Sequence, residues 1–163
     1  METKIILLRL YLDELGVDTT INTKDQRIIL QKAVYLGQAA GGDLGYRYSW
    51  YINGPYSSEL TRDYYKLAEE LNNGTQKTQY VLRDDLKERL HSIKDLLNCP
   101  REWSEGQAVW LELIASLDYA VRVLRMNKPD AKNYVVRHKP HLEQYMAVGL
   151  DALERSPLQM GVV

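Results

Sequence analysis

The stretch YRYSWYINGPYSSEL, residues 46–60, contains four tyrosines, one tryptophan and a Gly-Pro pair. Up to residue 52 its large side chains alternate between two sets, and a period of two is typical of a strand with one buried face. The face predicted to be buried carries Tyr46, Tyr48, Trp50 and Ile52, and the other face carries Arg47, Ser49 and Tyr51. We therefore predict a strand over residues 46–52, with Trp50 mostly buried.

The Gly54-Pro55 pair is expected to turn the chain out of this strand. Gly54 should then have a positive φ, or lie so close to a neighbouring backbone that a Cβ would clash. A helix is expected to follow from about Ser58 to Leu71, with Ser57 as its N-cap. The pattern predicts that Gly54, Pro55 and Ser57 are structural residues.

A strand that leads into a helix through two serines could instead be a phosphate-binding turn or a nucleophile elbow. The neighbouring residues argue against both. The P-loop lysine is absent, and Pro55 and Glu59 stand two residues before and after Ser57, where an elbow has glycines. We therefore interpret Ser57 as a helix cap and not as a catalytic or phosphate-binding serine.

Two helices are predicted before this stretch. Residues 2–15 place apolar side chains on one helical stripe, and Gly16 supplies a stop. Thr23-Lys-Asp-Gln26 has the pattern of a capping box, in which the Thr hydroxyl and the Gln side chain each bond a free backbone amide. This box should begin a helix that extends to about Ala40.

The chain after residue 74 is predicted to be mainly helical. Residues 75–82, TQKTQYVL, can form a second short strand, and Asp84 should cap the helix that follows it. Ser104-Glu-Gly-Gln107 has the pattern of another capping box and should begin a long helix in which Trp110 is mostly buried. Shorter helices should begin at Asn127 and at Lys139-Pro140.

These elements predict a mainly α protein with a small β element, a winged-helix-like domain with a helical C-terminal extension. We expect a single globular domain over 1–155, with a winged-helix-like part at 1–83 and a helical part at 84–155. Residues 156–163 are expected to be a flexible tail.

The composition limits the function classes. The 163 residues carry a net charge of -1, so there is no global basic field of the kind that marks many nucleic-acid binders. The single cysteine, Cys99, excludes an intramolecular disulfide and a cysteine-based zinc site. The longest apolar run near the N-terminus, Ile5 to Leu8, is too short for a signal peptide or a membrane span. We expect a cytoplasmic protein without a membrane partner.

Metal-binding and catalytic patterns are weak. His138 and His141, with Glu143 close by, offer ligand types that zinc accepts, but Pro140 starts a new helix between the two histidines. His91 belongs to a distant helix. No Ser/His/Asp set or carboxylate pair has a spacing that indicates acid-base chemistry. We therefore predict a non-enzymatic protein without a cofactor or a metal ion.

Charge is distributed unevenly along the chain. Residues 122–141 contain six Lys or Arg and one Asp, and such a segment could bind the phosphates of DNA or an acidic protein surface. The basic residues are Arg122, Arg125, Lys128, Lys132, Arg137 and Lys139. The helix after the Gly-Pro pair, by contrast, has two basic and four acidic exposed positions, which makes it a poor recognition helix for the major groove.

Several motifs in order resemble a known family. LQKAVYLGQ (30–38), the stretch 46–60, VWLELIASLDYAVR (109–122) and VVRHKPHL (135–142) are similar to the YwgA-like proteins of prokaryotes, over most of the chain to about residue 153. More distantly, the chain resembles the Panacea domain of SocA-like antitoxins and proteolytic adaptors, with Tyr56 where that domain usually has Val. The resemblance implies a non-catalytic, winged-helix-like module in phage, defence or toxin-antitoxin settings, with no established cofactor.

Two functions remain open. The first is a regulatory or protein-interaction module, antitoxin- or adaptor-like, that binds a protein partner through a tyrosine-rich surface. This surface would comprise Tyr46, Tyr48, Tyr51, Tyr56, Tyr64 and Tyr65. The alternative is a DNA-binding transcriptional regulator that uses the basic segment 122–141.

Overall fold

A computed structural model describes residues 2–74 and 78–158 of the chain. Over these residues the protein is mainly helical and has one two-stranded antiparallel sheet, which confirms the predicted fold class. In chain order the elements are α1 (Thr3–Leu15), α2 (Lys24–Ala39), β1 (Ser49–Tyr51), β2 (Gly54–Tyr56), α3 (Ser58–Asn72), α4 (Asp84–Ser92), α5 (Lys94–Leu97), α6 (Gln107–Arg122), α7 (Lys128–His138), the 3-10 helix η1 (Pro140–Tyr145) and α8 (Met146–Arg155).

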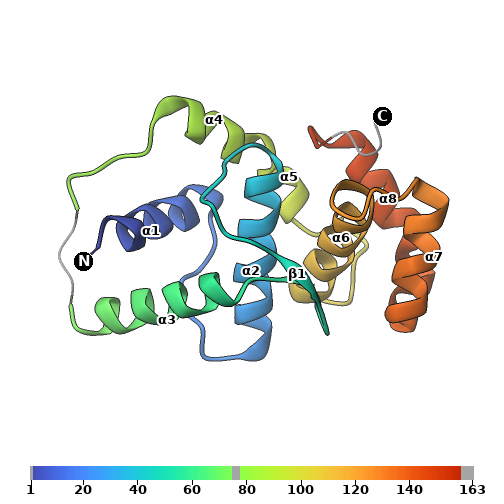
Figure 1. Ribbon diagram of the computed structural model, residues 1–163, viewed down its shortest axis with the longest axis horizontal. Coiled ribbons are helices and arrows are strands. Elements are labelled where there is room, and N and C mark those ends of the chain that lie inside the picture. The colour runs from blue at the N-terminus through green and yellow to red at the C-terminus, as the bar shows by residue number, and fades with distance from the viewer. Residues whose placement is uncertain (1, 75–77, 159–163) are drawn as a thin grey trace.

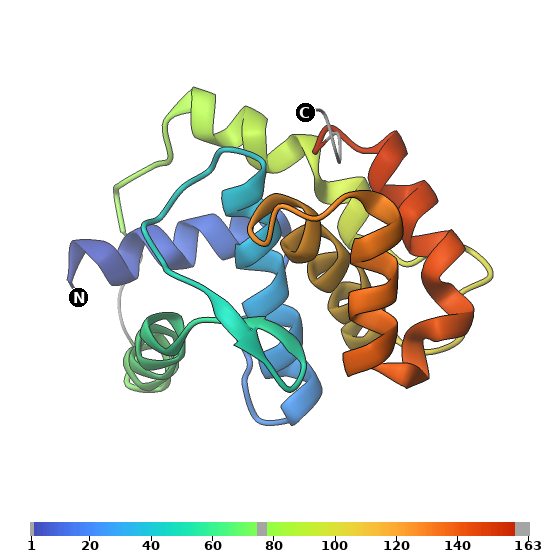
Figure 2. The ribbon, with the colours of Figure 1, turned by 45° about the vertical axis from the view of Figure 1, so that its right-hand side comes forward.

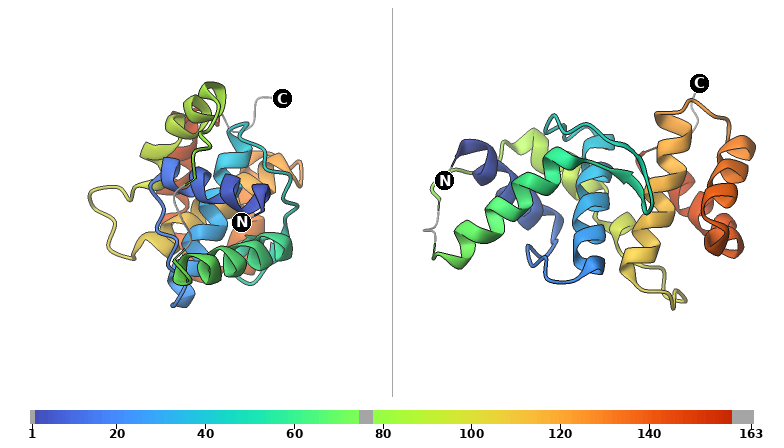
Figure 3. Two further views of the ribbon diagram at one scale, coloured as in Figure 1. Left: turned by 90° about the vertical axis from the view of Figure 1, so that its left-hand side faces the viewer. Right: turned by 60° about the horizontal axis from the view of Figure 1, so that its bottom comes forward.

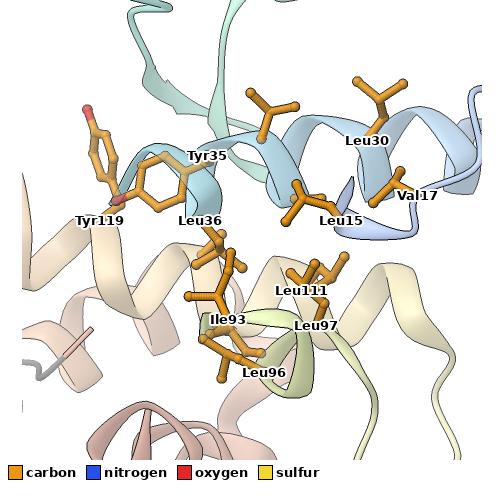
Figure 4. Close-up of a cluster of buried hydrophobic side chains, with 14 of the residues drawn as sticks. Leu15, Val17, Leu30, Tyr35, Leu36, Ile93, Leu96, Leu97, Leu111 and Tyr119 are labelled. Carbon is orange, nitrogen blue, oxygen red and sulfur yellow. The ribbon is translucent and has the colours of Figure 1, made fainter. Parts of the chain in front are cut away.

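Helices α2 and α6 form the centre of the molecule. They pack against each other more extensively than any other pair of elements. Helices α1, α3 and α4 lie to one side of this central pair, and α7 and α8 lie to the other (Figures 1 and 3). Between α2, α5 and α6 the core is a cluster of leucine, isoleucine and tyrosine side chains, which includes Leu36, Ile93 and Leu111 (Figure 4). Burial of these apolar side chains is the main stabilising contribution of the fold.

The predicted helix boundaries upstream are confirmed. Gly16 ends α1 in the left-handed conformation, at φ +73°. Thr23 and Gln26 form the predicted capping box at the start of α2, because the Thr side chain accepts from the Gln26 amide and the Gln side chain accepts from the Thr23 amide. Helix α1 therefore ends, and helix α2 begins, at the residue that the sequence predicts.

The β element is a tight hairpin, with Trp50 opposite Pro55 and Tyr51 opposite Gly54. The hairpin crosses in front of α2, and β2 contacts both α2 and α6 (Figure 2). Its turn lies at residues 52–53, so the prediction that Gly54-Pro55 turns the chain is wrong. These two residues instead begin the returning strand β2. Ile52 therefore lies at the tip, 73% exposed, and not on the buried face.

Gly54 has the backbone that we predicted from its place in the sequence. Its φ is +95°, and a Cβ built there would lie only 2.5 Å from the Ser116 Oγ of α6. Close approach of β2 to α6 therefore requires glycine at this position.

Burial alternates along residues 46–51 as predicted. Tyr46 is buried, whereas Arg47, Ser49 and Tyr51 are exposed. Trp50 is only half-buried, although the pattern predicts a mostly buried ring.

Helix α3 begins as predicted. Ser57 is buried, and its hydroxyl accepts from the Leu60 amide at 3.2 Å, so it is the N-cap. The strand predicted over 75–82 is not formed by residues 78–82, and residues 75–77 lie outside the described residues. The sheet partner of β1 is the adjacent β2, because a two-residue turn brings the chain straight back.

Two predicted caps in the C-terminal half are wrong. Helix α4 starts at Asp84 but has Arg83 at its N-cap, without a side-chain cap. Helix α6 starts at Gln107 with Gly106 at its N-cap, so Ser104 forms no capping box. Trp110 is nevertheless buried as predicted, and its ring N–H donates to the Leu96 carbonyl.

The last elements follow the predicted order. Asn127 caps α7 through its side chain, and Pro140 begins η1 and not an α-helix. In the segment predicted to be a tail, Leu158 is buried and its carbonyl accepts from Arg122, while residues 159–163 lie outside the described residues. Over the described ranges, no helix is both long and apolar enough to cross a bilayer.

Candidate protein-interaction site

The six tyrosines predicted to form a binding surface divide into a buried group and an accessible group. Tyr46 and Tyr64 are 5% and 3% exposed. The Tyr46 hydroxyl donates to Asp63 of α3 at 2.7 Å, and burial, together with this acidic partner, raises the pKa of Tyr46 well above its usual value. Tyr46 attaches the segment before β1 to α3 and offers almost no surface, contrary to the prediction that it contacts a partner. Tyr64 is buried as well, apart from the part of its ring that lines a pocket.

Tyr48 also has a structural role. Its ring packs edge-on against Tyr35, with 5.2 Å between the centroids, and its hydroxyl donates to the Gln31 carbonyl of α2. Burial raises the pKa of Tyr48 well above its usual value. Tyr48 therefore attaches the strand to α2 and offers little of its surface to a partner.

Four of the six tyrosines form two ring pairs, and Tyr64 is the buried member of one of them. Tyr51 and Tyr56 come from the hairpin, 5.2 Å apart between ring centroids, and Tyr64 and Tyr65 come from α3, 5.1 Å apart. All four rings line one pocket of about 230 Å³, which also has residues of α2 in its wall. Tyr51 and Tyr65 are 57% and 50% exposed. We call Tyr51, Ile52, Tyr56 and Tyr65 the tyrosine face, and the cavity beside it the tyrosine pocket.

A hydrogen-bond network behind the tyrosine pocket fixes its walls. Gln31 of α2 is buried, and its side chain accepts from the Ser57 amide and donates to the Ser57 carbonyl and to Thr61 Oγ1. The Thr61 and Tyr56 hydroxyls hydrogen-bond each other at 2.7 Å. One buried amide thus joins α2 to the end of the hairpin and the first turn of α3.

Two buried lysines hold the hairpin from its inner side. Lys32 of α2 donates to the Pro55 carbonyl at 2.8 Å, and Lys139, between α7 and η1, donates to the Ile52 carbonyl. Both are 2% exposed. Burial lowers the pKa of Lys32 to about 7; the negative Glu112 opposes this effect and the positive Lys139 adds to it. Lys139 therefore binds the hairpin backbone in its turn, and Lys32 binds it in β2.

Glu112 of α6 is the counter-charge of this inner side. It is buried, and its Oε1 lies 3.2 Å from Lys139 Nζ and 3.4 Å from the Nε2 of the exposed His141. Burial also lowers the pKa of Lys139, while Glu112 opposes the shift. Lys139 is thus interior, which makes the prediction that it contacts nucleic acid wrong.

The rest of the predicted basic segment is partly neutralised. Arg122 pairs with the buried Asp118 at 3.0 Å, and Lys128 pairs with Glu154 at 2.8 Å. Arg125, Lys132 and Arg137 are exposed. The segment therefore presents fewer available cations than the six that the sequence contains.

The histidines are not brought together into a metal site. His138 packs against Trp50 and Tyr134, and His141 lies beside Glu112. Among the residues that the structure describes, no three His, Cys, Asp or Glu side chains are grouped closely enough to hold a metal ion.

Sequence reasoning missed the two buried lysines because no local pattern marks them. Their hairpin acceptors lie 23 and 87 residues away along the chain. The only local signal is the polar pair Gln31-Lys32, which stands between Leu30 and the apolar residues Ala33 and Val34 of α2.

Comparison with known proteins finds no matching protein-family model, no matching curated protein and no matching solved structure. The function is therefore inferred from the motifs of the chain and from the geometry of its surface.

Proposed function

We propose that this chain is a non-catalytic protein-interaction module, antitoxin- or adaptor-like as its resemblance implies, that binds a protein partner through the tyrosine face. The observation that carries the proposal is the exposure of Tyr51 and Tyr65 at one pocket, with Ile52 exposed at the adjacent tip of the hairpin. Tyrosine is enriched at the energetic centres of protein interfaces because its ring offers a large contact area at low entropic cost.

The rigidity of the hairpin supports the same proposal. Lys32 and Lys139 hold its backbone from the inner side, while Gln31 fixes the junction with α3. A surface that is already ordered loses little conformational entropy on binding. The tyrosine face is thus prepared for a partner without rearrangement of the hairpin.

Co-purification from the native host tests the proposal. The tagged wild-type chain and the tagged variant Tyr51→Ala/Ile52→Ser/Tyr65→Ala are used as baits in parallel. Any protein that only the wild type retains is then purified, and its affinity for both chains is measured by titration. The expected result is one direct partner whose affinity falls at least a hundredfold on substitution.

The matched control is Tyr80→Ala/Val81→Ser, which removes two equally exposed apolar side chains from another pocket, between α1 and α4. This control should retain the partner. Retention of every wild-type partner by the tyrosine-face variant would overturn the proposal.

A further inference from the structure

The charge of the tyrosine pocket is one-sided. Its described lining includes three basic side chains, Lys24, Arg27 and Lys32, and no Asp or Glu. The chain as a whole is slightly acidic. A pocket with only positive charges on a weakly acidic protein offers a local attraction for one negative group.

Two of these basic side chains are able to reach a ligand directly. Lys24 is exposed at the first residue of α2. Arg27 uses one N–H on the Ile21 carbonyl at 2.9 Å, and a guanidinium carries five N–H donors. Arginine with donors to spare is well suited to a planar carboxylate, which it can bind through two parallel hydrogen bonds.

Lys32 contributes charge from behind the pocket. It is buried, and its ammonium is engaged with the Pro55 carbonyl. The charged groups that face it are Glu112 of α6 and Lys139, so the inner side holds two lysines and one carboxylate. Because burial lowers the pKa of Lys32 to about 7, a negative ligand in the pocket would favour the protonated form of this lysine.

We infer that the tyrosine pocket takes the carboxylate of a single Asp or Glu side chain from an extended partner segment, whose flanking apolar residues pack on Tyr51 and Ile52. This inference rests on the proposed function and adds the chemistry of the partner. It follows from the basic lining, from the aromatic walls and from the exposed apolar tip of the hairpin.

A nucleic-acid strand fits this surface less well. Aromatic rings beside cations can bind single strands, but such a strand carries a charge at every nucleotide and needs a basic groove along its path. The neighbouring α3 has Glu59, Asp63, Glu69 and Glu70 against Arg62 and Lys66. One carboxylate among apolar residues avoids the repulsion that a chain of phosphates would meet there.

A display library of random dodecapeptides tests the inference with the full chain as the immobilised target. Selection on the wild type should yield peptides with an Asp or Glu enriched at least fivefold at one position between apolar residues. For the best peptide, replacement of that acid by its amide should weaken binding at least tenfold, and so should Lys24→Gln/Arg27→Gln in the protein.

The matched control is Lys132→Gln/Arg137→Gln, which removes the same charge from α7 and should leave affinity unchanged. The inference is overturned if no peptide is enriched, if the amide peptide binds as tightly as the acid, or if an oligothymidine binds at the tyrosine face in place of peptides. The selected peptides could instead lack an acidic residue and still bind the wild type more tightly than the Tyr51→Ala/Tyr65→Ala protein. That result would overturn the inference but would support the proposed function.

Discussion

The two sides of the hairpin β1–β2 differ in what they contact. On its inner side two buried lysines bind the carbonyls of Ile52 and Pro55, and the buried Glu112 and Ser116 of α6 lie beside them. On its outer side Tyr51 and Ile52 are exposed and Tyr56 is half-buried. Substitutions on the inner side should therefore change stability, and those on the outer side should change binding alone.

The largest effect is expected from Glu112→Gln. This change leaves the buried Lys139 ammonium without its ion-pair partner and removes the negative charge that opposes the fall of the Lys32 pKa. Removal of one member of a buried ion pair costs about 3–5 kcal/mol. Urea denaturation at pH 7 measures the loss. In the double variant Glu112→Gln/Lys139→Met much of it should be recovered, because the unpaired charge is removed as well. Equal stability of the single and double variants would contradict the pairing.

Gly54→Ala should come next, with a loss of about 3 kcal/mol from its positive φ and from the clash with Ser116. Gly74→Ala is the matched control, because Gly74 also has a positive φ but no atom within 4 Å of an added Cβ, and it should cost about 1 kcal/mol. Addition of Ser116→Ala should restore part of the loss, since it removes the clashing oxygen. A loss no greater than that of Gly74→Ala would contradict the close approach of β2 to α6.

A smaller, pH-dependent effect is expected at Lys32. The folded protein releases the Lys32 proton above about pH 7, whereas the unfolded chain keeps it to the ordinary lysine pKa of 10.5. The unfolded state thus binds more protons over this interval, so the free energy of unfolding rises with pH. Between pH 7 and pH 9, the free energy of unfolding of the wild type should therefore rise by about 2 kcal/mol more than that of Lys32→Met.

Comparison with Lys32→Met is needed because Lys139 has a lowered pKa too and adds its own gain in both proteins. Chemical denaturation of the two proteins at matched pH values measures the difference. A difference that does not change with pH would mean that Glu112 keeps Lys32 charged throughout, contrary to the burial effect.

The smallest effect on stability is expected from the outer side. Tyr51→Ala/Tyr65→Ala removes rings that are at least half exposed, so the free energy of unfolding should change by no more than about 0.5 kcal/mol per residue. A loss above about 2 kcal/mol would show that these rings belong to the core and would break the division between the two sides.

Local patterns predicted much of the fold but little of the inner side. Alternation along residues 46–51, the Ser57 cap and the constraint on Gly54 depend on neighbours in sequence or on the backbone, and all three are confirmed. Lys139 stands in a basic run that is typical of a solvated helix face, yet its partners come from the hairpin and from α6. Tertiary contacts of this kind leave no periodic signal.

The exposure of the six candidate tyrosines could be predicted only in part, because burial also depends on tertiary contacts. Tyr51, Tyr56 and Tyr65 are accessible, as the tyrosine-rich pattern indicated. Tyr46 and Tyr64 are buried because a hydroxyl lets a large ring enter the interior when a partner such as Asp63 is present. Composition alone does not separate a tyrosine that packs from one that binds.

Amide chemical-shift mapping of the labelled protein with its best library peptide tests the central claim most directly. The largest shifts are predicted at residues 24–27, 51–56 and 61–65, with little change at 125–137. Shifts concentrated in 125–137, or in 80–86 beside α4, would contradict the assignment of binding to the tyrosine face.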